Sequence, residues 1–266
     1  MSTDNNAGGL AAGSGSRGED RHDEVLARNR LLLLLTFASG AVDVICFLGL
    51  GKVFTAFMTG NFVFLGMRIA GAPGPHVVSV LVSMGAFAVG VFIATRVVNP
   101  TRGASVWPRR VTSVLCLSVI AHAAFVALWI VVGGHPSLTS AVFLLGISAL
   151  AMGIQTGAVF SLGLQGVFTT AATATVTVLS GDSAHWANTA PERHRLAALL
   201  VALTCGAIAG GLLLLHARDL APVLPLVALA MVVAVASRFG ESRSTSRDAE
   251  GSRADVSLQP TIGGLS

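Results

Sequence analysis

Six long apolar runs dominate this sequence of 266 residues and restrict the folds that are open to it. Each run approaches the roughly 20 residues that a helix needs to cross a bilayer. Charged residues make up only 11% of the chain, whereas a soluble domain carries about 25%. We therefore predict an all-α integral membrane protein whose first partner is the lipid bilayer. The predicted spans cover about residues 31–50, 76–98, 111–132, 138–161, 195–215 and 222–238.

Polar tails flank this membrane domain of residues 31–238. Residues 1–30 and 239–266 are rich in glycine, serine and charge, which predicts disordered tails. The stretch LLLLLTFASGA resembles the end of a signal peptide. However, a long charged tail precedes it and the apolar run continues, so an uncleaved first span is expected. The sequence pI near 9.8 reflects arginines that flank the apolar runs, which indicates orientation in the bilayer and no nucleic-acid partner.

Two further apolar segments, at 53–71 and 167–181, are poor candidates for crossing. The second has about fifteen residues, too few for a hydrocarbon core of roughly 30 Å at 1.5 Å per residue. The first contains Thr59-Gly60-Asn61, which is unfavourable in a helix interior and predicts a break there. Both are expected to be short, broken, re-entrant segments. The threonines of the second segment are Thr169, Thr170, Thr173, Thr175 and Thr177.

The distribution of arginine and lysine favours a topology of six spans over one of eight spans. With six spans, both tails, the loop 99–110 and the loop 182–194 lie on one side, which the positive-inside tendency makes cytoplasmic. With eight spans, the arginine-rich loop 99–110 faces outside. Six spans with both termini cytoplasmic is the prediction, although Lys52 and Arg68 then lie on the outer side.

A repeated phrase suggests an internal duplication. LGLGKVFTAFMT at 48–59 returns as LGLQGVFTTAAT at 162–173, with eight identities over the eighteen positions 48–65. The units are expected at about 31–132 and 138–238, each with three crossings and one short segment. Three crossings invert the second unit, as in many secondary transporters. If all eight segments cross, the repeats are parallel and the argument for a central site weakens.

The stretch SGAVDVICFLGLGKVFTAFMTGNFVFLG at 39–66 resembles the signature of the YoaK-like bacterial membrane proteins, a family catalogued as a domain of unknown function. TATVTVLSGD at 173–182 is similar to the second half of that family. The resemblance implies a polytopic inner-membrane protein of bacteria and supplies no substrate. The residues that carry it are Gly40, Asp43, Phe54, Met58, Thr59, Gly60 and Asn61.

Asp43 is the sharpest candidate for function, because an acid inside a membrane helix is costly unless it is paired, protonated or wetted. It is either a coupling carboxylate for a proton or cation, or a hydrogen-bonded group that only holds helices together. Thr59 and Asn61 either cap the following half-helix or also meet a substrate, and Gly60 would let the backbone turn.

The second unit offers a parallel set of candidates. Thr173 and Thr175 are expected to line the same centre, although threonine in membrane helices also serves packing. Gln155 either joins this site or makes one interhelical hydrogen bond. Asp182 and His185 could gate the site or relay protons, or simply mark a solvated helix end.

The chain lacks the HExxH, GxSxG and Walker motifs and has no GxGxxG motif after a strand, so we expect neither an enzyme nor a cofactor or metal site. The preferred function is a secondary transporter or channel for a small molecule or ion, with a midplane site between two repeats. The alternative is a non-transporting membrane protein that assists partners or assembly. An oligomer is compatible with either function.

Overall fold

The structure is a computed structural model that describes residues 7–98, 107–162, 176 and 190–238. This part of the chain is helical and contains no strand. A short 3₁₀ helix, η1 (Arg218–Leu220), leads into a final helix at 223–238. The other helices are α1 (Ala7–Gly49), α2 (Met58–Ile69), α3 (Val77–Val98), α4 (Arg109–Val131), α5 (Leu138–Phe160) and α7 (Ala190–His216).

Six of these helices are long and apolar enough to cross a membrane, and they coincide with the six runs predicted from sequence. The predicted all-α membrane fold is therefore confirmed. α1 starts at Ala7, well before its apolar span, which begins at Glu24. Disorder of the two tails stays a prediction: residues 1–6 and 239–266 lie outside the described residues, and residues 7–30 belong to α1.

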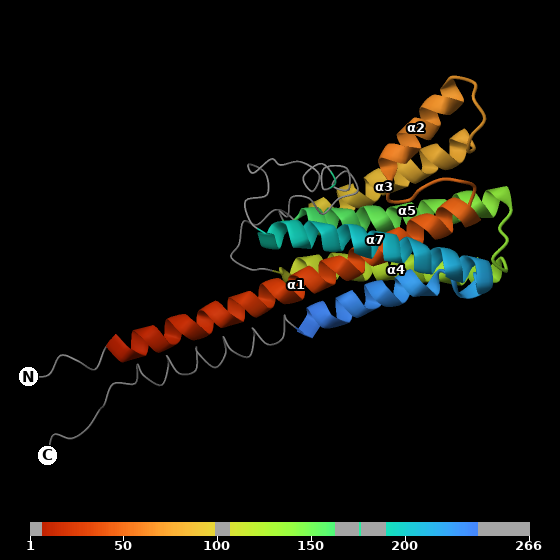
Figure 1. The fold of residues 1–266 in the computed structure, drawn as a ribbon. Helices are drawn as coiled ribbons and strands as arrows, with labels where there is room; N and C mark the ends of the chain where they lie inside the picture. Colours follow the sequence, from red (N-terminus) through yellow and green to blue (C-terminus); the bar gives the residue numbers. More distant parts are fainter. Residues whose placement is uncertain (1–6, 99–106, 163–175, 177–189, 239–266) are drawn as a thin grey trace, which may run out of the picture.

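The six spans run alternately in opposite directions (Figure 1). α1 ends and α3 begins at the same end of the bundle, so the short helix between them does not add a crossing. α2 has only 12 residues, about 18 Å at 1.5 Å per residue, and it stands away from the bundle beside α3. The first short segment is therefore not among the six candidate spans, in agreement with the prediction of six spans.

Two pairs of helices approach closely because glycine lies at their contacts. α3 packs on α5, where a Cβ built on Gly153 would lie 2.1 Å from the Phe87 carbonyl oxygen. α1 packs on α7, where a Cβ on Gly206 would lie 1.9 Å from the Phe37 carbonyl oxygen. Small residues allow such backbone contact in membranes, where packing replaces the hydrophobic drive between helices.

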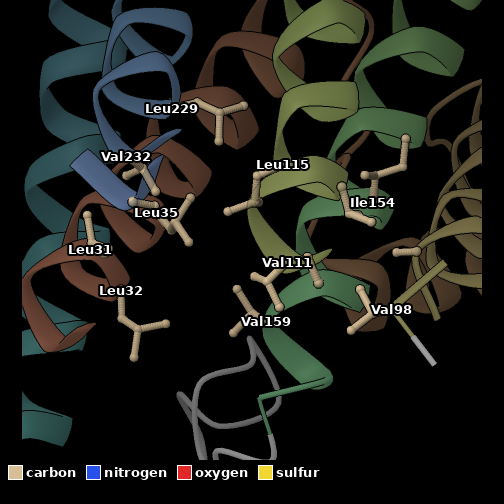
Figure 2. Packing of buried hydrophobic residues seen from close by; sticks show 14 of the residues in the cluster. Leu31, Leu32, Leu35, Val98, Val111, Leu115, Ile154, Val159, Leu229 and Val232 are labelled. Carbon is tan, nitrogen blue, oxygen red and sulfur yellow. The ribbon is translucent and has the colours of Figure 1, made fainter. Parts of the chain in front are cut away.

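The end of the bundle away from Asp43 contains a cluster of buried, branched aliphatic side chains. Figure 2 shows Leu31, Leu32 and Leu35 of α1 in one cluster with Leu229 and Val232 of the final helix. On the other side of the same cluster, α4 and α5 pack on each other and on the end of α3. Those contacts come from Val98, Val111, Leu115, Ile154 and Val159.

Candidate functional site

The centre of interest is the segment that joins α1 to α2. α1 ends in a left-handed turn, with φ of 102° at Gly51 and 66° at Lys52. The Lys52 N–H donates to the Phe47 carbonyl at 2.9 Å, which closes the helix end in the manner of a Schellman motif. The chain then runs back along α1 without regular structure until Met58. Irregular backbone inside a membrane protein needs partners for its polar groups.

Asp43 provides a hydrogen-bond acceptor for two backbone N–H groups of the returning chain. Its Oδ1 accepts hydrogen bonds from the backbone N–H groups of Thr55 and Ala56, both at 2.8 Å, and from the Thr55 hydroxyl at 3.3 Å. Asp43 lies six residues before the end of α1, so the segment re-enters by about 9 Å at 1.5 Å per residue. The acid is therefore paired with backbone, as a carboxylate buried to 8% exposure requires.

A chain of small polar groups continues from Thr55 toward α5. The Ser148 hydroxyl lies 3.5 Å from the Thr55 hydroxyl and 3.4 Å from the Cys46 thiol. Ser148, Thr55 and Cys46 are fully buried. The first span, the re-entrant segment and α5 are thus joined at one level by a carboxylate, two hydroxyls and a thiol.

Asn61 binds Phe54, the residue that precedes Thr55 in the segment. Its Oδ1 accepts from the Phe54 N–H at 3.1 Å, and its Nδ2 donates to the Phe54 carbonyl at 2.7 Å. Ser83 of α3 donates to the same carbonyl at 2.6 Å. Both polar groups of Phe54 are therefore satisfied by side chains, and Asn61 is fully buried.

The predicted break at Thr59-Gly60-Asn61 is wrong. These residues form the first turn of α2, which begins at Met58, and the irregular backbone lies upstream of them. The N-cap position is Phe57, and no side chain caps it. Asn61 stabilises the preceding loop instead, because its side chain reaches back seven residues to Phe54.

Thr59 and Gly60 do not join Asp43 in a common lining. Thr59 is exposed on α2, away from the buried face that carries Asn61. Gly60 is helical and has a packing role that differs from the predicted turn. A Cβ there would lie 2.8 Å from the Phe57 ring and 2.9 Å from the Phe54 ring. The Phe54 ring also stacks on Phe47 with their centroids 4.8 Å apart.

Gln155 joins α5 to α1. Its Nε2 donates to the Leu35 carbonyl at 3.2 Å, which supplies the single interhelical hydrogen bond considered from sequence. Its Oε1 is buried and has no partner among the described residues. Gln155 is seven residues after Ser148, two helical turns along the same face of α5.

His122 is buried and contacts the backbone of its own helix, α4. Its Nδ1 lies 3.1 Å from the Ser118 carbonyl, which can only accept, so this nitrogen carries the proton. The Ser118 hydroxyl in turn donates to the Ala151 carbonyl of α5 at 2.9 Å. The remaining sequence candidates lie outside the described residues: Thr173, Thr175, Asp182 and His185.

Sequence reasoning missed Thr55, Ser83 and Ser148 as parts of this site. Thr55 carried a signal, because it is identical to Thr169 in the repeated phrase. Ser83 and Ser148 carried none, because a single serine in an apolar run is common and only the packing of α3 and α5 brings them to the segment.

These features define a class: a helical membrane protein with six candidate spans and a re-entrant segment pinned by side chains from three spans and α2. The chain belongs to the family described as proteins of unknown function, DUF1275, whose sequence model matches residues 31–236. It is also similar to the UPF0700 transmembrane protein YoaK of Bacillus subtilis (strain 168). The two are 37% identical over 155 residues, which is 58% of this chain and 67% of that protein. No solved structure matches.

Proposed function

We propose that this protein is a secondary transporter or channel for a small molecule or ion, with a site near the bilayer midplane between two inverted repeats. Asp43 is the coupling or binding acid. Asp43 lies on α1 and Gln155 on α5, and the contact between these two helices forms the described part of the transport path. The observation that carries the proposal is the re-entrant segment at 50–57, whose irregular backbone is held by a buried carboxylate.

Such a segment is a recurrent device of transport proteins. Non-helical backbone at membrane depth is tolerated where protein or a water-filled cavity surrounds it. In secondary transporters it usually belongs to discontinuous helices that build the substrate site. An intramembrane carboxylate is costly, and its usual uses are ion pathways and proton relays. Asp43 and residues 53–57 combine both features.

The arrangement of the helices supports the inverted repeat. The duplication would make α5 the counterpart of α1 and α7 the counterpart of α3. α1 and α5 run in opposite directions (Figure 1). Under this correspondence the contact of α1 with α7 is equivalent to the contact of α5 with α3, and glycine lines both contacts. Leu48 and Leu162, which open the two repeated phrases, both lie at the C-terminal end of a span.

The alternative function, a non-transporting protein that assists partners or assembly, is favoured by a different observation. Asp43, Asn61 and Ser83 all bind the backbone of the re-entrant segment. In this second candidate the polar groups serve packing, and the segment presents a fixed surface to a partner protein.

Transport by purified protein in liposomes separates the two functions. Proteoliposomes would be tested with labelled small metabolites and monovalent ions, with and without a proton gradient. We expect uptake by the wild type and its loss in Asp43→Asn. Ser118→Ala is the matched control, since it removes a buried polar contact of α4 and α5 without touching the segment.

The same measurement can contradict the proposal. Uptake equal to that of protein-free liposomes over the whole panel would favour the alternative. Uptake that survives in Asp43→Asn would keep transport and remove Asp43 from its mechanism. Gln155→Leu provides a second test, because it removes the hydrogen bond to the Leu35 carbonyl together with Oε1, which has no partner among the described residues.

A further inference from the structure

The re-entrant segment has two attachments that differ in their response to protons. Asn61 holds Phe54 through an amide, which does not titrate and which bonds both the N–H and the carbonyl. Asp43 holds the next two residues, Thr55 and Ala56, through one carboxylate oxygen. A carboxylate is an acceptor on both oxygens, and its hydrogen bonds are charge-assisted.

The hydrogen-bond donors around Asp43 are neutral groups, so a proton from solution can neutralise the charge of its carboxylate. The groups that act on the carboxylate are the backbone amides of the segment and the Thr55 hydroxyl. On α1 its titratable neighbour is Cys46, and α5 contributes the Ser148 hydroxyl. Lys52 lies 5.4 Å over the Phe47 ring instead. Within the described residues, no basic side chain is paired with the carboxylate.

Protonation would weaken one attachment and leave the other intact. When a proton from solution bonds to the carboxylate, the charge is lost and one oxygen becomes a hydroxyl donor. The bonds to Thr55 and Ala56 then fall from charge-assisted to neutral strength, roughly half. Phe54 stays bound by Asn61 and Ser83, neither of which changes.

We propose that residues 53–57 form a proton-sensitive latch that opens when Asp43 is protonated, with Phe54 as its fixed point. Opening exposes the groups that the segment covers, above all Cys46 and Ser148. The latch gives the acid of the proposed transporter its coupling role, and to that extent it rests on the proposed function. The motion itself can be measured without any substrate.

Cys46 is a native reporter of the latch. It is fully buried and packs in the same cluster as Leu50, Val53 and Ala56 of the segment. The other cysteines, Cys116 and Cys205, are exposed and would be replaced by serine. The reaction of Cys46 with a water-soluble maleimide then reports how often the segment opens.

The experiment measures the rate of Cys46 labelling in liposomes at pH 8 and pH 5.5. A thiol reacts more slowly at low pH, so each rate is divided by that of an exposed reference cysteine, introduced as Pro73→Cys in a protein with Cys46→Ser. We expect this ratio to rise about tenfold or more at pH 5.5, since the two bonds that weaken are of the charge-assisted kind. Asp43→Asn should show the higher ratio at both pH values.

Ser83→Ala is the matched control, because it removes a bond to the same segment and no titratable group. It should raise the ratio at both pH values and preserve its rise at low pH. A ratio for the wild type that does not change between the two pH values would overturn the latch, and this test needs no variant at Asp43. Labelling that responds to pH in a protein that transports nothing would keep the latch and remove the proposed function.

Discussion

The Asp43 carboxylate and the Thr55 N–H, 2.8 Å apart, join the middle of a membrane span to a segment that has already left it and turned back. This bond places non-helical backbone beside α1 about 9 Å inside the helix end. It also changes the meaning of a buried acid in an apolar run. The acid compensates backbone donors, and any role in coupling must operate through those donors.

Asn61→Ala should destabilise the protein strongly, because it leaves the buried N–H of Phe54 without a partner and removes one bond to its carbonyl. An unsatisfied buried donor costs about 1–3 kcal/mol. We expect a lower melting temperature in detergent, measured by the loss of helical circular dichroism. Thr59→Ala, two residues away and exposed, should melt like the wild type. Equal melting of the two variants would contradict the assigned role of Asn61.

Gly153→Ala should also destabilise the protein, because the added Cβ meets the Phe87 carbonyl oxygen at 2.1 Å and forces α3 and α5 apart. Overpacking of this kind costs about 1–3 kcal/mol. Gly85→Ala on α3 is the control, since its Cβ would meet no atom within 4 Å and alanine favours a helix. Thermal denaturation monitored by size-exclusion chromatography compares the pair, and a melting point for Gly153→Ala at or above that of Gly85→Ala would refute the close contact.

Gln155→Leu should leave stability nearly unchanged. The substitution loses the bond to the Leu35 carbonyl but also removes the buried Oε1, which has no partner among the described residues. Removing an unsatisfied polar atom offsets much of the loss. A fall in transport without a fall in melting temperature would place Gln155 on the path. A loss of more than about 3 kcal/mol would show instead that its hydrogen bond is a main tie between α5 and α1.

Topology can be tested with single cysteines at positions 73, 103 and 135. An impermeant thiol reagent should reach positions 73 and 135 from the outer side and position 103 from the inner side, as six spans and the positive-inside tendency require. The reversed pattern would favour eight spans. Positions 73 and 135 on opposite sides would contradict the arrangement in Figure 1, where the α2–α3 and α4–α5 turns share one end of the bundle.

Hydropathy and helix propensity, two different properties of the residues, explain which predictions from the sequence were confirmed and which were wrong. The six spans were readable because hydropathy is local: a run such as 111–132 must be shielded from water whatever its neighbours are. The short first segment was expected for another reason, a break at Thr59-Gly60-Asn61. The break at Thr59-Gly60-Asn61 was wrong because helix propensity is a weak prior. Packing of Gly60 beneath two phenylalanine rings and burial of Asn61 favour a helix there.

The sequence by itself determined that this chain lies in a membrane, which six runs form its candidate spans, and that Asp43 needs a partner. Only the tertiary structure decided what that partner is. Thr55 and Ala56 follow Asp43 by twelve and thirteen residues, and Ser148 comes from more than a hundred residues away. Hydropathy acts on each residue separately, whereas a hydrogen bond needs two groups at one point in space. That meeting depends on how α1, α3 and α5 pack.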